Sequence, residues 1–321
     1  MPSLAIVKAA NASFNPSYTP IIVITGATSG IGEAITRLFA SLQKGRAQIY
    51  LVGRNRAAAN SIIASLPQPP PEVSKHNSSQ TPAQGYTYEF IQCDVSLMKN
   101  VHDLARDLSS RLPHLNFLVH SAGVIGLSRR EETSEGIDLK LASRYYARWT
   151  LTNDLLPLLR KAKDLGQVAS VVSVLGAGVG LEKVDVDDLG MKTNYGWLRA
   201  MLETASYNDL MVAEFAKREP TIAFTHMYPG GVDTAMVIPS NPILKVLIRA
   251  IHPILRFFLI SSADCAEYVV YALLVGEKGM HRRDSHADDI GLKKFPAADG
   301  MTAEELQKRL WDHTVQETSV S

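Results

Sequence analysis

Short apolar runs recur along the chain, and longer stretches with helical periodicity separate them. The first run, Ile21–Ile24, is entirely apolar and ends in a glycine-rich turn, which is typical of a buried parallel strand that enters a loop. After the turn, apolar residues recur at helical spacing and form one stripe that would pack on a sheet. They are Ile31, Ile35, Leu38, Phe39 and Leu42. The pattern predicts a strand, a turn and a helix.

Five further apolar runs predict the other strands of the same sheet. They are Ile49–Val52, Tyr88–Ile91, Asn116–Val119, Val171–Leu175 and Ile222–Met227. Strands that alternate with helices form parallel sheets with helices on both faces. We therefore predict an α/β fold, a doubly wound parallel sheet of Rossmann type. No polar linker is long enough to divide this sheet, so we expect residues 1–321 to form a single domain.

Two segments depart from the strand and helix pattern. Residues 66–86 are rich in Pro, Ser, Gln and Asn and cannot bury enough apolar surface to become ordered, which predicts a mobile surface loop. Residues 243–260 are mostly apolar, but their basic residues share one helix face and argue against a membrane span. These basic residues are Lys245, Arg249, His252 and Arg256. We expect residues 236–262 to form a C-terminal substrate lid or, alternatively, a membrane-facing segment that binds anionic lipid.

Charge and cysteine content narrow the class of protein. The chain has 33 Lys and Arg against 32 Asp and Glu, a balance that argues against a nucleic-acid partner. Cys93 and Cys265 are far apart and form no Cys-x-x-Cys pair, so we predict neither a metal site nor a disulfide framework. The first twenty residues lack the basic start and apolar run of a secretory signal. We therefore expect a cytoplasmic protein, with peripheral membrane contact through residues 243–260 as the alternative.

A glycine-rich turn joins the first predicted strand to the first predicted helix. It reads Thr-Gly-Ala-Thr-Ser-Gly-Ile-Gly over residues 25–32. Backbone N–H groups in such a turn can meet a pyrophosphate without obstruction by a Cβ atom, and the helix N-terminus adds partial positive charge. We predict a dinucleotide-binding loop, against the alternative of a tight turn without a ligand. The residues that we expect to contact the cofactor are Thr25, Gly26, Ser29, Gly30, Ile31 and Gly32.

The spacing Gly-x-x-x-Gly-x-Gly led by threonine resembles the short-chain dehydrogenase/reductase superfamily, and three further motifs follow in that family's order. They are Cys-Asp-Val at 93–95, Ser-Ala-Gly at 121–123 in place of Asn-Ala-Gly, and Pro-Gly-Gly-Val-Asp-Thr at 229–234. The resemblance covers residues 21–234 and implies a single doubly wound domain, often homodimeric or homotetrameric. It implies that Asp94 contacts the adenine amino group. It further implies a cofactor site that includes Ser121, Ala122, Gly123, Val232 and Thr234.

The residue after the second predicted strand indicates which nicotinamide cofactor binds. An acid at this position favours NAD, whereas a cation accommodates the 2′-phosphate of NADP. The chain has no acid there, and Arg54 can hold the phosphate because its guanidinium fork matches phosphate oxygens. We therefore predict NADP(H). A solvated pair of arginines, Arg54 and Arg56, at a helix start is the alternative.

The resemblance implies a catalytic centre of Asn, Ser, Tyr and Lys, and this chain retains only the tyrosine. Tyr207 stands where Tyr-x-x-x-Lys is expected, but Met211 occupies the lysine position, as in an atypical branch of the family. Gly176 falls at the serine position, and Ser173, three residues upstream on a strand, would face the other side. We predict that Tyr207 donates the proton in a reduction. A core tyrosine with a hydrogen-bonded hydroxyl is the alternative.

Arg144 falls at the family's asparagine position. A fixed positive charge near Tyr207 would lower the pKa of that phenol, as the missing lysine does. We therefore predict Arg144 as a second catalytic residue that points between Tyr207 and the nicotinamide ribose. An ordinary ion pair of Arg144 with Glu135 or Asp138 is the alternative.

These residues support three hypotheses about function. The first is an NADPH-dependent reductase of a carbonyl group on an apolar small molecule, in which residues 236–262 form an apolar wall of the substrate pocket. The second is a dinucleotide-binding protein of the same superfamily that has lost redox chemistry or catalyses a non-redox reaction. The third is an accessory protein that binds a membrane surface through residues 243–260.

Overall fold

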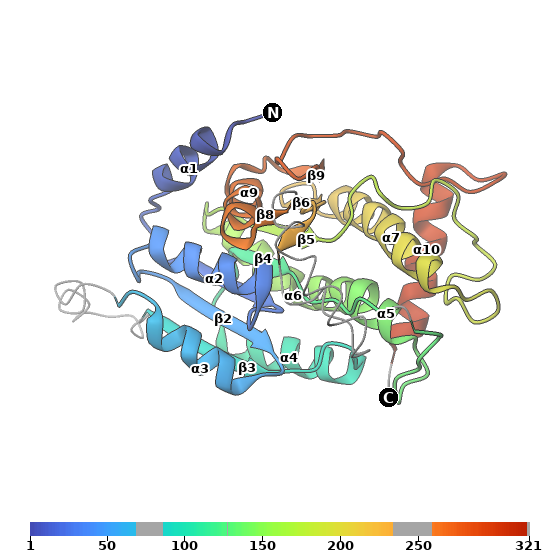
Figure 1. The fold of residues 1–321 in the computed structure, drawn as a ribbon, viewed down its shortest axis with the longest axis horizontal. Coiled ribbons are helices and arrows are strands. Elements are labelled where there is room, and N and C mark those ends of the chain that lie inside the picture. Colours follow the sequence, from blue (N-terminus) through green and yellow to red (C-terminus); the bar gives the residue numbers. More distant parts are fainter. Residues whose placement is uncertain (69–85, 127, 234–258, 320–321) are drawn as a thin grey trace.

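The core of the structure, a computed structural model, is one sheet of seven parallel strands in the order β3-β2-β1-β4-β5-β6-β9 (Figure 1). The structure describes residues 1–68, 86–126, 128–233 and 259–319. The strands are β1 (Ile21–Thr25), β2 (Gln48–Gly53), β3 (Thr87–Gln92), β4 (Phe117–His120), β5 (Ser170–Val174), β6 (Ala223–Met227) and β9 (Gly279–Arg283). This order confirms the predicted doubly wound sheet.

Six of the strands match the predicted apolar runs to within two residues, because central parallel strands are buried on both faces and must be apolar throughout. The pattern does not predict β9, whose sequence Gly-Met-His-Arg-Arg is mostly polar. This strand lies at the edge of the sheet and pairs with β6 alone. An edge strand has one unpaired side and needs no continuous apolar run.

Helices cover both faces of the sheet (Figure 1). On one face lie α2 (Gly30–Leu42), α3 (Arg56–Ser65) and α9 (Ser262–Val275), with α1 (Leu4–Ser13) packed against α9. On the other lie α4 (Met98–Arg111), α6 (Ala147–Asp164), α7 (Trp197–Arg218) and α10 (Ala303–Thr318). The short helix α5 (Leu139–Leu141) and the π-helix η2 (Ala142–Tyr146) lead into α6. A small ribbon pairs β7 (Val232–Asp233) with β8 (Ile260–Ser261).

The C-terminal helix α10 begins with the capping box that its sequence indicates. The Thr302 side chain accepts the N–H of Glu305, and the Glu305 carboxylate accepts the N–H of Thr302. Trp311 then packs edge-on against Trp149 of α6 and Phe215 of α7, with ring centroids 4.9 and 5.0 Å apart. The helix therefore covers the apolar groove between α6 and α7.

Two segments that depart from the predicted strand and helix pattern, residues 66–86 and 236–262, lie mostly outside the described residues. The part that lies outside includes residues 69–85 of the predicted mobile loop, residues 236–258 of the predicted lid, and with them the whole basic stripe. In the described part of the chain, every helix is too short or too polar to cross a membrane.

Candidate active site

A cavity of about 800 Å³ lies along the carboxyl ends of the parallel strands. It extends from the end of β2, past the turn after β1, to the space between β4, β5 and the first half of α7. Ligands of open α/β sheets bind in this position, where the strand order reverses. The cavity brings together most predicted site residues, which are Gly26, Ser29, Gly30, Ile31, Arg54, Asp94, Ser121, Ala122, Gly123, Val232 and Arg144.

The glycine-rich turn fits a bound pyrophosphate. Gly26 has a φ of 74°, and a Cβ atom there would lie 2.7 Å from the backbone nitrogen of Ala122, so a side chain would obstruct the turn. Ser29 caps α2 without a side-chain hydrogen bond, which leaves the first N–H groups of this helix free of a side-chain cap. Exposed N–H groups at a helix N-terminus bind phosphate oxygens.

Two predicted residues of the turn shape it without lining the cavity, and a third site residue cannot be placed. The Thr25 hydroxyl donates to the carbonyl oxygen of Val119 at 3.5 Å. A Cβ atom on Gly32 would lie 2.3 Å from the carbonyl oxygen of Gly26, so the glycine lets α2 pack closely on the turn. Thr234 lies outside the described residues.

The end of the cavity beside β2 and β3 has the groups that an adenosine phosphate needs. Arg54 follows β2 and lines the cavity, and it forms no ion pair within the described residues. Asp94 follows β3, and its Oδ1 atom accepts hydrogen bonds from the Ser96 N–H at 3.0 Å and the Ser96 hydroxyl at 2.7 Å. These bonds orient the carboxylate and leave Oδ2 available to accept from an amino group.

At the opposite end, the π-helix η2 brings Arg144 into the cavity. Single-turn π-helices are rare and often mark functional sites. The hydroxyl of Ser143 accepts the N–H of Val124 at 3.2 Å, which ties η2 to the segment after β4. A Cβ atom on Gly123 would lie 3.5 Å from Cγ of Arg144 and 3.6 Å from Nη2 of Arg148. Two arginines therefore lie against the end of β4.

Arg144 is held by neutral groups. Its Nε atom donates to the Thr204 hydroxyl at 3.1 Å and its Nη2 atom to the Met201 carbonyl at 3.4 Å. Burial lowers the pKa of Arg144 to about 10. The alternative, an ion pair of Arg144 with Glu135 or Asp138, is not formed: Arg144 donates to Thr204 and Met201, and both carboxylates accept backbone N–H groups.

Arg148 lies one helical turn further on and supports the ends of two strands. Its Nη1 atom donates to the hydroxyl of Ser173 at 2.8 Å and to the carbonyl of Val174 at 2.9 Å, and Nη2 donates to the carbonyl of Ala122 at 2.6 Å. Burial, followed by repulsion from Arg144, lowers the pKa of Arg148 to about 9. This guanidinium thus fixes the floor of the cavity between β4 and β5.

Tyr207 lies in the hydrophobic core and does not line the cavity. Its side chain is fully buried, its hydroxyl donates to the Leu189 carbonyl at 3.1 Å, and its ring packs edge-on against Tyr145. Burial, and then the charge of Glu203, raise the pKa of Tyr207 well above its ordinary value, the opposite of what a proton relay needs. The structure contradicts the assignment of Tyr207 as proton donor and of Arg144 as the group that lowers its pKa.

The face of α7 that lines the cavity assigns different residues to the family's tyrosine and lysine positions. A Cβ atom built on Gly176, the residue at the family's serine position, would lie 3.2 Å from Cβ of Ala205. Ala205 and the residue four positions later, Asp209, lie on the same face of the helix, whereas Tyr207 is rotated by about 200° from Ala205. The family's Tyr-x-x-x-Lys spacing therefore falls on Ala205 and Asp209, and Met211 belongs to the core.

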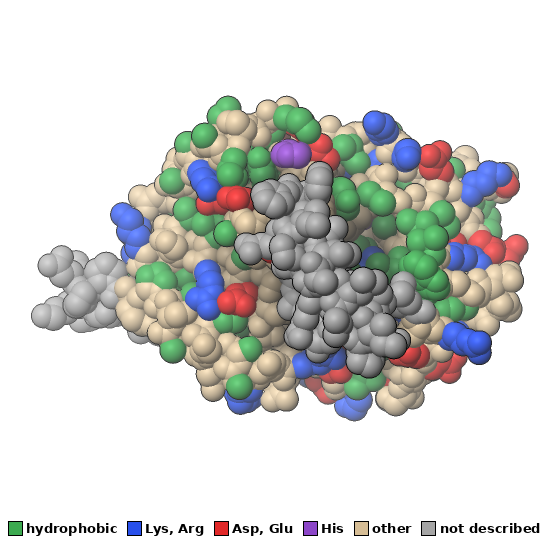
Figure 2. Space-filling model, viewed as in Figure 1, with side chains coloured by type: hydrophobic (Ala, Val, Ile, Leu, Met, Phe, Trp, Pro, Cys, Tyr) green, Lys and Arg blue, Asp and Glu red, His purple; other side chains and the backbone are tan. Residues whose placement is uncertain are grey.

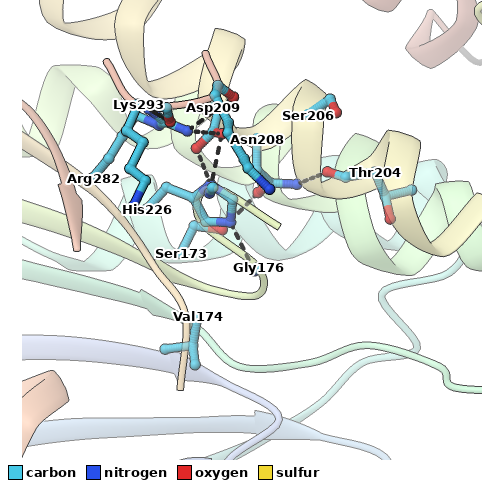
Figure 3. Close-up of polar contacts among 12 residues, drawn as sticks. Ser173, Val174, Gly176, Thr204, Ser206, Asn208, Asp209, His226, Arg282 and Lys293 are labelled. Atoms are coloured by element: carbon cyan, nitrogen blue, oxygen red, sulfur yellow. Dashed lines mark hydrogen bonds and ion pairs between the residues drawn. The ribbon is translucent and has the colours of Figure 1, made fainter. Parts of the chain in front are cut away.

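Asp209 forms a buried network with a histidine and an arginine (Figure 3). Its Oδ1 atom accepts from Nδ1 of His226 at 2.6 Å and its Oδ2 atom from Nη2 of Arg282 at 2.6 Å. Nε2 of His226 accepts the N–H of Gly176 at 3.0 Å, which fixes the histidine tautomer with its proton on Nδ1. The network thus holds the end of β5 in place where the family has a lysine.

Sequence reasoning misses three residues that line or shape this end of the cavity: Arg148, Ala205 and Tyr228. The four-residue spacing from Arg144 is a signal for Arg148, since residues four apart share a helix face. Tyr228 precedes the Pro-Gly motif at 229–230 and is the only tyrosine among the described residues that line the cavity. Ala205 has no functional group that would mark it in the sequence as a site residue.

Hydrophobic side chains gather on the surface near the N-terminal end of α7 (Figure 2). Trp197 and Leu198 line the cavity and are 42% and 53% exposed, and Val179 and Ile125 line it from other segments. The mouth of the cavity at its arginine end is therefore apolar.

Comparisons with known proteins agree with this geometry. The family model of the KR domain matches residues 21–180, which include the glycine-rich turn and Gly176 but end before α7. The protein named Oxidoreductase AN1596 from Emericella nidulans is 34% identical over 244 residues, covering 75% of this chain and 67% of that protein. Short-chain dehydrogenase/reductase tropG from Talaromyces stipitatus is 24% identical over 331 residues, covering 95% and 96%.

Among solved structures, the NADPH-bound carbonyl reductase from chicken fatty liver superposes with a TM-score of 0.59 at 15% identity, covering 85% of this chain and 99% of that one. At this identity the likeness shows a shared fold. The relatives and the fold together establish that the chain belongs to the short-chain dehydrogenase/reductase superfamily, a class of oxidoreductases.

Proposed function

We propose that this chain binds NADP(H) and reduces a carbonyl group of an apolar small molecule. One observation carries the proposal: a single cavity connects Arg54, the glycine-rich turn and Asp94 with a chamber that has apolar walls and arginines at its floor. Bound NADPH would supply a hydride at its nicotinamide. Relatives of this chain are named as oxidoreductases of fungi, which supports the same reaction class.

Each end of the cavity has a distinct task in this proposal. Arg54 holds the 2′-phosphate, Asp94 accepts from the adenine amino group, and the N-terminus of α2 binds the pyrophosphate. Gly123 and Val232 line the part of the cavity where the nicotinamide would lie. Trp197 and Leu198 contact the apolar body of the substrate.

Arg144 and Tyr228 are the groups that we assign to substrate binding and to proton transfer. The guanidinium of Arg144 has N–H groups that no acceptor among the described residues uses, and they can hold and orient the substrate in the cavity. We assign the hydroxyl of Tyr228 as the proton source for the carbonyl oxygen, because Gly176 and Ala205 offer no hydroxyl at the usual serine and tyrosine positions. A neutral phenol suffices in the direction of reduction, which consumes a proton.

Replacing Arg54 with alanine tests the cofactor assignment. The change should weaken NADPH binding by about 1.5–3 kcal/mol, the range for hydrogen bonds to charged groups, which corresponds to roughly 10- to 150-fold in Kd. NADH lacks the 2′-phosphate, so its affinity should barely change. Isothermal titration calorimetry with both cofactors measures the two effects. Arg106→Ala, which removes an exposed arginine on α4, is the matched control and should alter neither affinity. Equal losses for NADPH and NADH in Arg54→Ala would contradict NADP selectivity.

The altered centre also favours a second function, that of a dinucleotide-binding protein without redox activity. Gly176, Ala205 and Asp209 replace the serine, tyrosine and lysine of the family, and Asp209 is committed to a structural network. Such a protein would bind NADPH with the same dependence on Arg54 but would not oxidise it with any carbonyl compound. Monitoring NADPH absorbance against a panel of apolar aldehydes and ketones separates the two functions.

A further inference from the structure

Two buried arginines at the floor of the cavity lack a negative partner. Arg144 and Arg148 are 7% and 2% exposed, and neither forms an ion pair with an acid in the part of the chain that the structure describes. Burying an unpaired charge costs several kcal/mol, so buried cations in proteins are normally paired with an anion. The only acid that lines the cavity within the described residues is Asp94, at the adenosine end.

Both arginines line the cavity and keep hydrogen-bond donors that no acceptor among the described residues uses. Arg144 uses Nε and one N–H of Nη2, so both N–H groups of Nη1 remain without an acceptor among the described residues. Nη1 of Arg144 and Nη2 of Arg148 lie 4.0 and 3.6 Å from the point that a Cβ atom on Gly123 would occupy. The Nε atom of Arg148 is buried without a partner. The two guanidinium groups therefore come together at Gly123, which lines the cavity.

From this arrangement we propose that the substrate is an apolar organic acid whose carboxylate binds Arg144, with Arg148 adding positive charge behind it. The inference rests on the proposed function for the position of the substrate, and it narrows that function to a class of substrate. A carboxylate presents two oxygens to a guanidinium fork. The surrounding wall of Trp197, Leu198 and Leu202 is apolar, which suits a singly charged group on a hydrophobic body.

The lowered pKa values of the two arginines are consistent with a site that binds an anion. Burial lowers the pKa of Arg144 to about 10, and burial together with Arg144 lowers that of Arg148 to about 9. A bound carboxylate would offset this loss of solvation and raise both pKa values.

Binding of carboxylates and of their uncharged amides tests the proposal without requiring turnover. The probes are decanoate, 3-phenylpropanoate and cinnamate, each paired with its primary amide and titrated into the full chain with and without NADP⁺. We expect at least one acid to bind more tightly than its amide by roughly 10-fold or more. Arg144→Met should remove that preference, Arg144→Lys should restore part of it, and Arg106→Met should leave it unchanged because Arg106 is exposed on α4.

The outcomes separate this inference from the proposed function. If every acid binds no better than its amide, or if Arg144→Met keeps the preference, the carboxylate site is refuted. If Arg144→Met instead weakens NADP⁺ binding and leaves acid binding unchanged, the guanidinium serves the cofactor and the inference is wrong. Failure of NADP⁺ to bind at all, with the acid preference intact, would refute the proposed function and leave the anion site standing.

Discussion

Replacing Tyr228 with phenylalanine should lower kcat for NADPH-dependent carbonyl reduction by roughly 10²- to 10⁴-fold, the usual contribution of a positioned proton donor. Tyr228 lines the cavity, and the positions of the family's serine and tyrosine are Gly176 and Ala205, which can donate nothing. Phenylalanine keeps the ring and removes only the donor. NADPH affinity should therefore stay within a factor of two to three, which titration of the variant measures.

Tyr207→Phe is the matched control, because it makes the same chemical change in the same protein. The Tyr207 hydroxyl is buried and donates to the Leu189 carbonyl, so its loss should cost about 1 kcal/mol of stability and leave kcat unchanged. Steady-state kinetics on one working substrate and urea denaturation of both variants provide the comparison. If Tyr207→Phe abolishes turnover while Tyr228→Phe does not, the register derived from the structure is wrong.

Asp209→Asn should destabilise the fold by about 3–5 kcal/mol, the cost of breaking a buried ion pair by removing one partner. Arg282 is fully buried, and Asp209 is the carboxylate that accepts from it. An asparagine keeps one oxygen for His226 but turns an NH₂ group toward Arg282, where donor would face donor. Urea denaturation followed by circular dichroism measures the loss. Asp299→Asn, which breaks the exposed pair with Lys183, is the control and should have no measurable effect.

The same network predicts how stability depends on pH. Burial alone would raise the pKa of Asp209, but the interactions with His226 and then Arg282 are stronger together, and the pKa of Asp209 is lowered. Burial also lowers the pKa of His226. Both folded-state values lie below the unfolded ones, about 3.9 for Asp and 6.5 for His, so the unfolded chain takes up protons first on acidification. The wild-type network should lose stability as the pH falls below about 6.5 and lose more below about 4. Asp209→Asn should lack the loss below pH 4 that comes from this carboxylate.

The sheet can be predicted from the sequence because its central strands are buried on both faces. The runs at β1, β2, β4, β5 and β6 are apolar, with few exceptions, since neither side of these strands meets water. The edge strand β9 is mostly polar, so its sequence does not predict a strand. The cofactor end of the cavity is predictable for a similar reason, since a phosphate needs glycines and a helix start at fixed spacing.

The reactive end could not be predicted residue by residue. All ten residues from Glu203 to Val212 on α7 are buried, polar and apolar alike, so this part of the helix has no solvent-exposed polar face that would set its register. In this stretch Tyr207 stands out chemically, but it faces the core. The sequence around Asp209 does not indicate that it pairs with His226 and Arg282, because these residues lie on strands β6 and β9. Only the three-dimensional packing shows that Ala205 meets Gly176.

A crystal structure of the chain with NADP⁺ would test the central claim most directly. We predict that the adenosine phosphate contacts Arg54, that the pyrophosphate meets the N–H groups at the start of α2, and that the nicotinamide lies against Gly123 with Tyr228 and Arg144 beside it. Tyr207 should keep its hydrogen bond to Leu189 and touch no atom of the cofactor. A dinucleotide bound outside this cavity, or a nicotinamide ribose in contact with the Tyr207 hydroxyl, would contradict the account.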